Sequence, residues 1–265
     1  MSEAANLLDL SGRVALVSGA GQGVGAKTAE YLAAQGASVV VNDFVLERAE
    51  AIAAQISGAG GKAIAMQADV TSFEAVKEMV ARGSAELGCI DILVNNAGNA
   101  GANPQGLTGK PFWEVAPAEW EPFIQVNLYG VLNCCRAVIP GMIEAGNGGR
   151  LITVISDAGR IGEVSLEAYS AAKAGAAGLM RSLARSLGRF DITANSVAIA
   201  ATNTPAVQTM TSNEELMTRV LKNYIIRRVG EPSDVAAMVT FLASSCAGWT
   251  TGQTYPVNGG LSVNL

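Results

Sequence analysis

The sequence contains no histidine in its 265 residues. Histidine is the commonest general base and the commonest metal ligand in proteins, so proton chemistry here would need another side chain. The four cysteines, Cys89, Cys134, Cys135 and Cys246, have no metal or disulfide spacing, and the adjacent pair suits two small buried positions of a helix. We therefore expect no metal centre and a reduced, cytoplasmic protein.

Charge and long apolar runs are also scarce. Charged residues make up 15% of the chain and the net charge is −5, which disfavours non-specific binding to nucleic acid. No apolar run approaches the roughly 18 residues of a membrane span, and residues 1–5 lack the basic and apolar regions of a signal peptide. The hydrophobic content of 49% predicts a core-rich globular protein, with residues 1–265 in one domain.

Short runs rich in valine, isoleucine and leucine alternate with longer alanine-rich patterns of helical period. The expected strands are Val14–Ser18, Ser38–Asn42, Ala63–Gln67, Asp91–Asn95, Leu151–Ser156, Ile192–Val197 and Thr254–Val257, and the expected helices are 24–35, 45–58, 72–86, 117–144, 167–188 and 232–243. This order predicts an α/β fold, a doubly wound parallel sheet of about seven strands with helices on both faces. The irregular stretch 199–230, with a helix-like run around 213–222, is expected to form a lid over the substrate.

A glycine-rich turn, Ser18-Gly-Ala-Gly-Gln-Gly-Val-Gly25, follows the first expected strand and opens the first expected helix. Such a turn lets the backbone lie against a pyrophosphate at a helix N-terminus, where any side chain would block the approach. The residues expected to contact a dinucleotide here are Ser18, Gly19, Gln22, Gly23, Val24 and Gly25. Glycine-rich turns also occur for plain packing reasons, so the motif alone does not decide between the two readings.

An acid, Asp43, ends the second expected strand. A carboxylate at that position can accept hydrogen bonds from the hydroxyls of an adenine ribose and would repel a 2′-phosphate. Neither Gln22 nor Phe44 is basic, so no nearby cation is evident to hold that phosphate. We expect NAD in preference to NADP, although Asp43 could instead cap the helix that follows it.

Ser156, Tyr169 and Lys173 form the pattern best suited to proton transfer. Tyr169 and Lys173 are four residues apart and share one face of the expected helix. A neighbouring ammonium group stabilises a phenolate and lowers its pKa from about 10, so Tyr169 could exchange a proton with an alcohol or ketone. Ser156 could donate a hydrogen bond to the substrate oxygen. A tyrosine and a lysine at this spacing are more often ordinary helix neighbours, and the accompanying motifs favour the catalytic reading.

Taken together, the motifs resemble those of the short-chain dehydrogenase/reductase family, in its short single-domain branch. They occur in the family's order along nearly the whole chain: the glycine turn, Asp69-Val70, Asn95-Asn-Ala-Gly98, Asn127, Ser156, Tyr169-x-x-x-Lys173 and Gly252-Gln-x-Tyr-x-Val-Asn-Gly-Gly260. The resemblance implies a Rossmann-type sheet and an NAD(H)-dependent oxidoreductase that interconverts a secondary alcohol and a ketone. A non-catalytic NAD(H) sensor is the alternative class, and a sugar-nucleotide epimerase is disfavoured.

The resemblance also assigns roles to further residues. It implies that Asn127 holds a water connecting Lys173 to solvent, and that Lys173 bonds the nicotinamide ribose. The implied cofactor contacts are Asp43, Phe44, Asp69, Val70, Asn96, Ala97, Gly98, Tyr169, Lys173, Ile199 and Thr204. The family usually has Pro-Gly where this chain has Ile199-Ala200, so we expect an altered loop path beside the nicotinamide.

The substrate is the least determined part of the prediction. Residues 98–113, 157–164 and 200–220 are expected to line the pocket, and Phe112, Trp113, Ile161 and Met210 suggest an apolar substrate. The segment Ser156–Gly162 loosely resembles alicyclic hydroxyacyl-CoA dehydrogenases, where Arg160 could meet a phosphate or carboxylate. Other candidates are 3-oxoacyl carrier-protein thioesters, steroids, and cyclic or sugar alcohols. The family resemblance further implies a homotetramer or homodimer.

Overall fold

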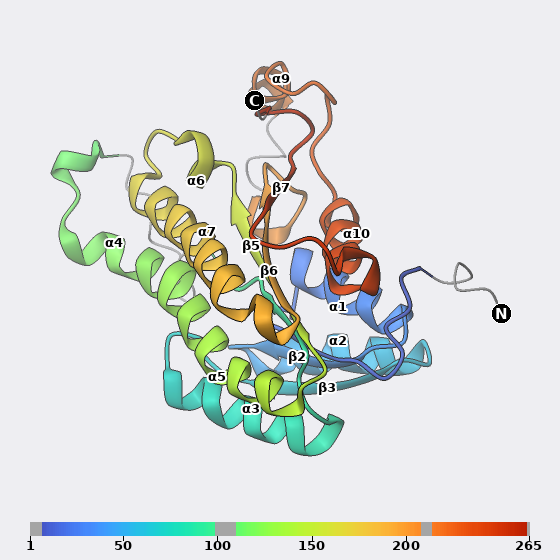
Figure 1. The fold of residues 1–265 in the computed structure, drawn as a ribbon. Helices are drawn as coiled ribbons and strands as arrows, with labels where there is room; N and C mark the ends of the chain where they lie inside the picture. The colour runs from blue at the N-terminus through green and yellow to red at the C-terminus, as the bar shows by residue number, and fades with distance from the viewer. Residues whose placement is uncertain (1–6, 99–109, 208–213, 264–265) are drawn as a thin grey trace.

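Seven strands form one parallel sheet in the order β3-β2-β1-β4-β5-β6-β7 (Figure 1). The computed structural model describes residues 7–98, 110–207 and 214–263. The strands are β1 (Val14–Val17), β2 (Ser38–Asp43), β3 (Lys62–Gln67), β4 (Ile92–Asn95), β5 (Gly149–Ser156), β6 (Ile192–Ile199) and β7 (Thr254–Val257). All seven expected strands are present to within two residues at each end, and the predicted fold class is confirmed.

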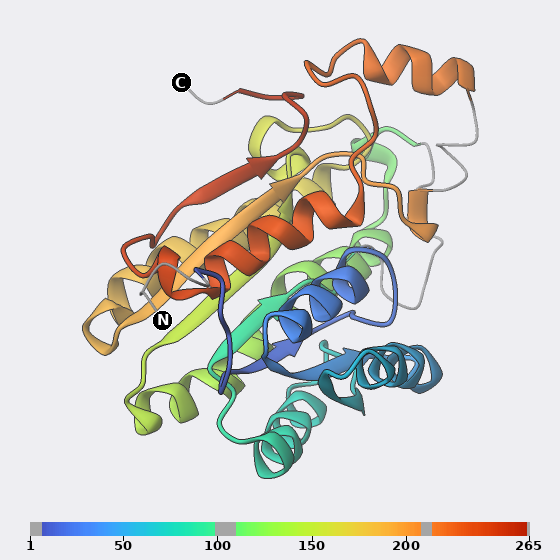
Figure 2. The same ribbon diagram turned by 90° about the vertical axis from the view of Figure 1, so that its right-hand side faces the viewer.

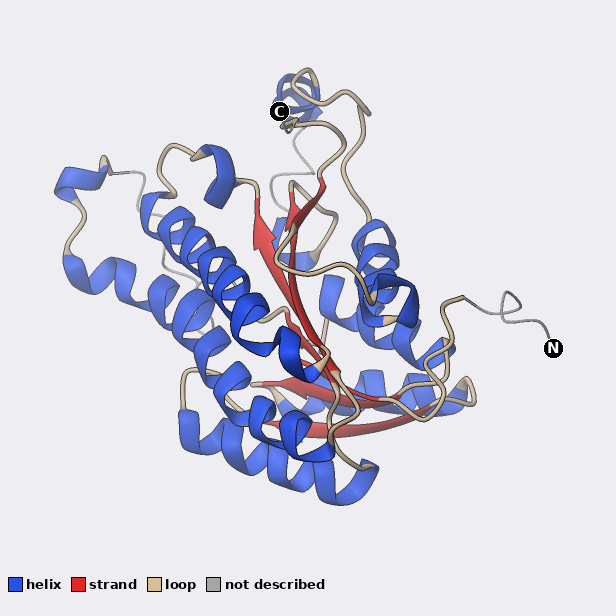
Figure 3. Ribbon diagram, in the orientation of Figure 1, coloured by secondary structure: helices blue, strands red, loops and turns tan. Residues whose placement is uncertain are grey.

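Helices connect the strands and lie on both faces of the sheet (Figures 2 and 3). They are α1 (Gly23–Ala34), α2 (Leu46–Gly58), α3 (Phe73–Leu87), α4 (Pro117–Ile124), α5 (Gly130–Ala145), α6 (Ala158–Ile161), α7 (Glu167–Leu187), α9 (Glu214–Leu221) and α10 (Pro232–Ala243), with the short helices η1 (Phe112–Glu114), η3 (Gly188–Phe190), η4 (Pro205–Val207) and η5 (Ser245–Ala247). The expected helices are confirmed to within two residues, α9 matches the helix-like run around 213–222, and only α6 had no counterpart in the prediction.

Side chains along each strand point alternately to the two faces of the sheet, so the core has two layers. In β1, Val14 and Leu16 pack with α3, α5 and α7, whereas Ala15 and Val17 pack with α1, α2 and α10. Successive side chains of a strand point to opposite faces, so a strand covered on both faces must be apolar throughout. Burial of each such valine or leucine contributes about 1.5–3 kcal/mol, which makes the two layers the main source of stability.

One continuous helical stretch, Pro117–Ala145, is long and apolar enough to cross a membrane by length and composition, with a mean hydropathy of 1.3. Polar residues, Gln125, Asn127, Asn133 and Arg136, interrupt this stretch, so the expectation that no apolar run approaches the length of a membrane span is not contradicted. Its buried residues, Cys134, Cys135 and Met142 among them, pack on the sheet, as in the core helix of a globular protein. Burial raises the pKa of both thiols, that of Cys135 to about 12, so the predicted role of this pair as small buried residues is confirmed.

Candidate active site

The predicted site residues come together because the sheet is parallel. Its strands all end at one edge, and Ser18, Asp43, Asn96, Ser156 and Ile199 stand at or just after those ends. Between β3 and β4 the chain crosses to the other side of β1, so the connections that follow β1 and β4 run in opposite directions along the sheet. Ligands of doubly wound sheets bind in the crevice at such a switch point.

The glycine turn between β1 and α1 leaves no room for side chains. Gly19 and Gly23 have left-handed backbone angles, with φ of +61° and +58°. A Cβ atom on Gly25 would lie 2.3 Å from the Gly19 carbonyl oxygen, and one on Gly19 would lie 2.8 Å from the Ala97 Cα atom. The backbone N–H groups that open α1 thus lie beside glycines whose lack of a side chain would let a pyrophosphate approach.

Ser18 and Asn96 hold this turn in place. The Ser18 hydroxyl accepts hydrogen bonds from the backbone N–H groups of Asn96 and Ala97, at 3.1 and 3.2 Å. The Asn96 side-chain amide donates to the carbonyl oxygens of Ser18 and Gly19, at 3.0 and 2.9 Å. These two predicted cofactor residues therefore brace the turn, and they fix it to the end of β4.

Asp43 is buried and already shares its carboxylate with the backbone. One oxygen accepts from the Gly21 N–H at 3.1 Å and the other from the Val45 N–H at 3.0 Å. The expectation that no cation lies near this position needs correction, because α2 returns Arg48 to the same place. A Cβ atom on Gly21 would meet the Arg48 Cβ at 2.5 Å, and the guanidinium lies 5.8 Å from the centre of the Phe44 ring.

Asp69 and Val70 lie after β3, next to the helix that carries Asn127. The Asp69 carboxylate accepts from the backbone N–H and the hydroxyl of Thr71, at 2.9 and 2.8 Å, which is the turn chemistry expected of aspartate. Val70 is buried, and a Cβ atom on Gly130 would lie 2.7 Å from its Cγ2. Both residues remain at the predicted edge, where Val70 fixes the position of α5.

Ser156 and Tyr169 meet where β5 ends and α7 begins. The Ser156 hydroxyl is near enough to act on the Tyr169 phenol, and its effect lowers the pKa of Tyr169. Burial has the larger effect and raises that pKa, and the charge of Glu163 acts in the same direction. The pKa of Tyr169 is raised on balance, so the expected net lowering by a neighbouring ammonium is not found.

Lys173 lies one helical turn beyond Tyr169 and is buried. Its ammonium is 5.7 Å from the centre of the Tyr169 ring and donates to the Val154 carbonyl at 2.9 Å. Burial lowers the pKa of Lys173 to about 8. A Cβ atom on Gly98 would lie 3.4 Å from the Lys173 Nζ and 3.3 Å from the Asn127 Oδ1, so glycine leaves the space between these two polar groups open.

Asn127 reaches this space through an irregularity in its helix. The α4–α5 stretch is interrupted by the π-helical segment η2 (Gln125–Tyr129), a feature frequent at functional sites. Asn127 is fully buried there, and its side-chain amide donates to the Phe123 carbonyl at 2.9 Å. The four predicted catalytic residues thus lie around one point of the sheet edge, although nothing in the residue pattern predicts the π-helix.

Arg160 has a different position from the one expected of a phosphate-binding loop arginine. Its guanidinium contacts the buried Asp157 carboxylate at 2.5 Å and donates to the Ser262 hydroxyl at 2.7 Å. An arginine paired in this way with a buried carboxylate is held in place, and its pairing disfavours the predicted contact with coenzyme A.

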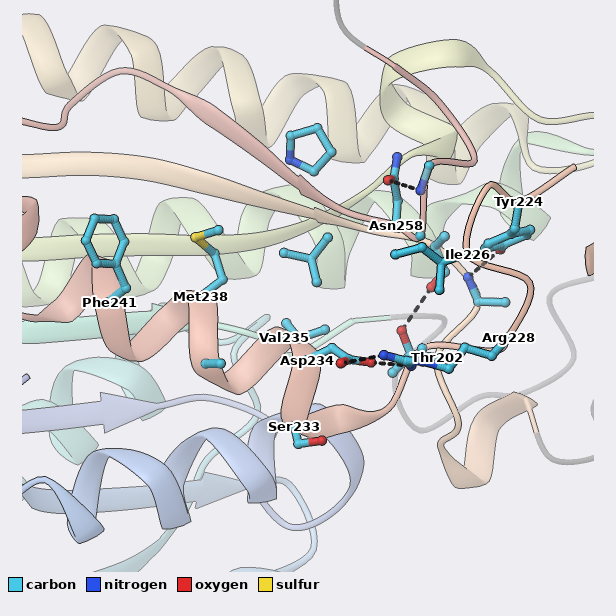
Figure 4. Close-up of a pocket in the computed structure, with 18 residues that line it drawn as sticks. Thr202, Tyr224, Ile226, Arg228, Ser233, Asp234, Val235, Met238, Phe241 and Asn258 are labelled. Carbon is cyan, nitrogen blue, oxygen red and sulfur yellow. Dashed lines mark hydrogen bonds and ion pairs between the residues drawn. The ribbon is translucent and has the colours of Figure 1, made fainter.

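A cavity of about 700 Å³ opens beside this edge, between α10, the end of β7 and the segment 200–230 (Figure 4). Tyr224, Met238, Phe241 and Asn258 are among the residues that line it, whereas the four predicted catalytic residues are not. Of the expected substrate contacts, Phe112, Trp113 and Ile161 are exposed beside α4 and α6, while Met210 and residues 99–109 lie outside the described residues.

Comparison with known proteins places this geometry in a family. A family model described as enoyl-(acyl carrier protein) reductase matches residues 19–262. With that match and the relatives below, the resemblance drawn from the motifs is confirmed. The chain is a short-chain dehydrogenase/reductase. Its relatives in this family are alcohol and oxo dehydrogenases, so it belongs to a family of oxidoreductases.

Three short-chain dehydrogenase/reductase relatives differ in the substrates that their names state. The chain is 33% identical over 253 residues to a 7α-hydroxysteroid dehydrogenase of Escherichia coli strain K12, covering 96% of this chain and 95% of the relative. It is 37% identical to cis-4-hydroxycyclohexanecarboxylate dehydrogenase of Sinomonas cyclohexanicum, covering 94% and 96%. It is also 37% identical to 3-oxoacyl-[acyl-carrier-protein] reductase FabG of Staphylococcus epidermidis, covering 93% and 98%.

Two solved structures from the family hold different cofactors. A 7α-hydroxysteroid dehydrogenase in complex with NADH and 7-oxo glycochenodeoxycholic acid has a TM-score of 0.89 and 33% identity, covering 98% of each chain. A gluconate 5-dehydrogenase of Burkholderia cenocepacia in complex with NADP and tartrate has a TM-score of 0.90 and 30% identity, covering 98% of this chain and 99% of that one. Family membership therefore leaves the choice between NAD and NADP open.

This chain has Ile199-Ala200 where the family usually has Pro-Gly, and Ile199 is the last residue of β6. Ile199 pairs with Ser156 and Val257, and its carbonyl accepts from the Asp157 N–H at 2.9 Å. Thr204 then lies over the glycine turn, since a Cβ atom on Gly23 would be 3.0 Å from its Cγ2. Thr204 therefore stands beside the expected cofactor path in this member of the family too.

Proposed function

We propose that the chain is an NAD(H)-dependent oxidoreductase that interconverts a secondary alcohol and a ketone by hydride transfer. The observation that carries this proposal is the buried Lys173 ammonium 5.7 Å from the centre of the Tyr169 ring, with Ser156 near enough to lower the pKa of that phenol. All three lie at the edge of the sheet that also carries the glycine turn. No such convergence is needed for packing alone.

The glycine turn, Asp43 and Thr204 would hold the nicotinamide cofactor, which supplies the hydride chemistry when bound. In the direction of oxidation, Tyr169 takes the proton of the substrate hydroxyl as general base. Ser156 donates a hydrogen bond to the same oxygen and stabilises negative charge that develops on it. In the direction of reduction, Tyr169 returns the proton to the ketone oxygen.

Lys173 and Asn127 would complete the proton path. Burial raises the Tyr169 pKa, so the phenolate would need the nearby ammonium and a positively charged nicotinamide to form near neutral pH. Lys173, with a pKa of about 8, can itself give up and regain a proton close to that range. Gly98 leaves open the space next to Lys173 and Asn127 through which a water-borne proton would pass.

NAD is the proposed cofactor because of Asp43. Its buried carboxylate stands at the end of β2, where it would accept from the ribose hydroxyls and repel a 2′-phosphate. Arg48 weakens this argument, since its guanidinium lies beside Phe44 and could meet such a phosphate. We expect NADH to be preferred and NADPH to be used slowly rather than rejected.

An apolar secondary alcohol of ring size is the proposed substrate class. Phe112, Trp113, Ile161 and Val164, in the segments that border the site, expose large apolar surfaces. Arg160, the residue once expected to bind a coenzyme A phosphate, is engaged by Asp157 and Ser262. Acyl thioesters stay as the second candidate, because one relative is named as a reductase of acyl carrier protein substrates.

We also propose a homotetramer in the cytoplasm. Tyr129 and Leu132 expose apolar surface on the α4–α5 stretch, and Phe241 does so on α10, on the other face of the sheet. Two separate apolar faces are what a dimer of dimers requires. The four cysteines are all free, as a reducing compartment would keep them.

The test is the loss of NADH absorbance with matched ketones, each offered free and as its coenzyme A thioester, with NADPH in parallel. We expect turnover of cyclic ketones, and a loss of roughly 10²–10⁴-fold in kcat for Tyr169→Phe with NADH binding retained. Full activity of that variant would refute the mechanism. Tight NADH binding without turnover of any ketone would favour the sensor alternative. Turnover of thioesters alone would make acyl thioesters, and not free cyclic alcohols, the substrate class.

A further inference from the structure

Asp157, the residue after Ser156, has a buried carboxylate that points away from the reacting groups. Only 2% of the residue is exposed, and three side chains donate to its oxygens. Arg160 donates at 2.5 Å to one oxygen, while Asn258 and Ser262 donate at 2.6 and 2.9 Å to the other. Arg160 and Asn258 also donate to the Ser262 hydroxyl, at 2.7 and 3.0 Å, which closes the network.

The segment 258–262 links this network to Tyr224 and Ile226, which line the cavity. The Ile226 N–H donates to the Gly259 carbonyl at 2.8 Å, and a Cβ atom on Gly259 would lie 3.1 Å from the Tyr224 ring. The Tyr224 hydroxyl accepts in turn from the Ala201 N–H at 3.1 Å, just beyond β6. Asn258 and Tyr224 stand at the same end of the cavity in Figure 4.

Ser156 depends on the backbone that Asp157 controls. The Ser156 hydroxyl accepts from the Ala158 N–H at 3.1 Å, so its direction follows the loop at residues 157 and 158. On the other side of this loop, a Cβ atom on Gly159 would lie 2.9 Å from the backbone nitrogen of Ala174, next to Lys173. The loop is thus held between α7 and the segment 258–262.

We propose that Asp157 is a positioning residue, which fixes the Ser156 hydroxyl toward Tyr169 by fastening the loop after β5 to the C-terminal segment 258–262. A carboxylate is suited to this place because both of its oxygens accept hydrogen bonds, here from three donors. An amide in the same position would turn its NH2 group, which only donates, toward at least one of these donors. The consequence for turnover rests on the proposed function; the geometric claim does not.

The test compares Asp157→Asn with Asp91→Asn. Asp91 is the control, because its carboxylate also binds an arginine, Arg13. It lies at the opposite edge of the sheet, where it accepts in addition from the Val14 N–H. We expect Asp157→Asn to lower kcat by about 10–100-fold, as small displacements of reacting groups do, with NADH affinity unchanged. Asp91→Asn is expected to keep kcat. If Asp157→Asn lowers only the melting temperature, as the control does, Asp157 is structural and the proposal fails.

A second readout needs no substrate. Tyr169, labelled as 3-fluorotyrosine, is titrated by 19F NMR and identified by the signal lost in Tyr169→Phe. Displacement of the Ser156 hydroxyl from Tyr169 would raise the Tyr169 pKa, whereas loss of the Asp157 charge alone would lower it. The direction of the shift therefore distinguishes a displaced Ser156 from a lost charge. Lys173 and Glu163, which also face Tyr169, are unchanged in the variants.

We expect an upward shift in Asp157→Asn, in the same direction as in Ser156→Ala. An upward shift in a protein that reduces no ketone would support the positioning role and refute the proposed function. No shift, or a downward one, would overturn the positioning role even in an active enzyme. If Asp157→Asn does not fold, Ser262→Ala removes one donor to the same carboxylate and is expected to give a smaller shift in the same direction.

Discussion

Lys173 is the residue at which function and stability conflict most directly. Its ammonium is buried beside Tyr169, and burial lowers its pKa from 10.5 to about 8. The folded protein therefore holds a charge near neutral pH that the unfolded chain would hold more easily in water. Its hydrogen bond to the Val154 carbonyl offsets part of this penalty. Under the proposed function, the stabilisation of a phenolate is the chemical task that accounts for a buried lysine at this position.

Lys173→Met should therefore abolish turnover and stabilise the fold. The pKa gap corresponds to roughly 3 kcal/mol, from which the lost hydrogen bond removes about 1 kcal/mol, so we expect a gain of about 2 kcal/mol at pH 7. Between pH 8 and 10.5 the unfolded wild type binds more protons than the folded one, so wild-type stability rises and the gain shrinks. Urea unfolding at pH 7 and pH 10 measures both.

The exposed Lys77 supplies the control for this prediction, since 65% of its side chain is accessible. Lys77→Met should leave the unfolding free energy nearly unchanged at both values of pH. An equal gain from Lys173→Met at pH 7 and pH 10 would contradict the account, because packing of the methionine and not removal of the charge would then explain it.

Residue types could be assigned from the sequence, but their surroundings could not. The spacing of Tyr169 and Lys173 predicts a shared helical face, yet the sign of the Tyr169 pKa shift depends on burial that only tertiary structure sets. The proximity of Arg48 to the glycine turn was missed for a similar reason. The sequence does not show that the chain folds back after β2 and places the start of α2 next to Gly21. Arg160 was assigned to solvent or ligand, whereas its partner Ser262 lies 102 residues away.

At the scale of elements, the strands were the most predictable part of the molecule. Continuous apolar runs specify strands buried on both faces, and parallel pairing then brings their polar ends to one edge. The π-helical segment around Asn127 and the short helix α6 could not be predicted, because each is stabilised by contacts with other elements. The close packing of Gly159 against α7 is one such contact.

The glycine turn is the element whose geometry can be tested most simply. A Cβ atom on Gly25 would lie 2.3 Å from the Gly19 carbonyl oxygen and 2.4 Å from the Asn96 amide nitrogen, so the turn must move to accept it. We expect Gly25→Ala to destabilise the protein by roughly 1–3 kcal/mol. NADH affinity should fall at least tenfold, because the backbone N–H groups no longer converge. Urea unfolding and NADH fluorescence titration give the two values.

Gly58→Ala is the matched control for that substitution. Gly58 ends α2, and a Cβ atom there would meet nothing within 4 Å. Alanine at this position should leave NADH binding unchanged and stabilise the fold by up to about 1 kcal/mol. Should Gly25→Ala bind NADH as tightly as the wild type, the turn is a packing motif and its role in cofactor binding is refuted.

At the scale of the whole molecule, two of the exposed apolar surfaces of the described residues lie on opposite faces of the sheet. One lies on the α4–α5 stretch, which is apolar enough to pass for a membrane span, and includes Leu132 and Tyr129. The other lies on α10, where Phe241 borders the large cavity. Because α5 and α10 cover opposite faces of the sheet, one partner cannot bury both surfaces. A closed assembly that covers both needs four copies.

This arrangement predicts how the assembly comes apart. We expect the wild type to be a tetramer in light scattering after size exclusion, and Leu132→Glu and Phe241→Glu each to reduce it to a dimer through a different interface. The double variant should be monomeric, since a carboxylate in either contact has no described partner charge and would be buried unpaired. Val164→Glu, at a position 88% exposed beside the site, should leave the mass unchanged. A tetramer that survives both substitutions would show that these surfaces are not its interfaces.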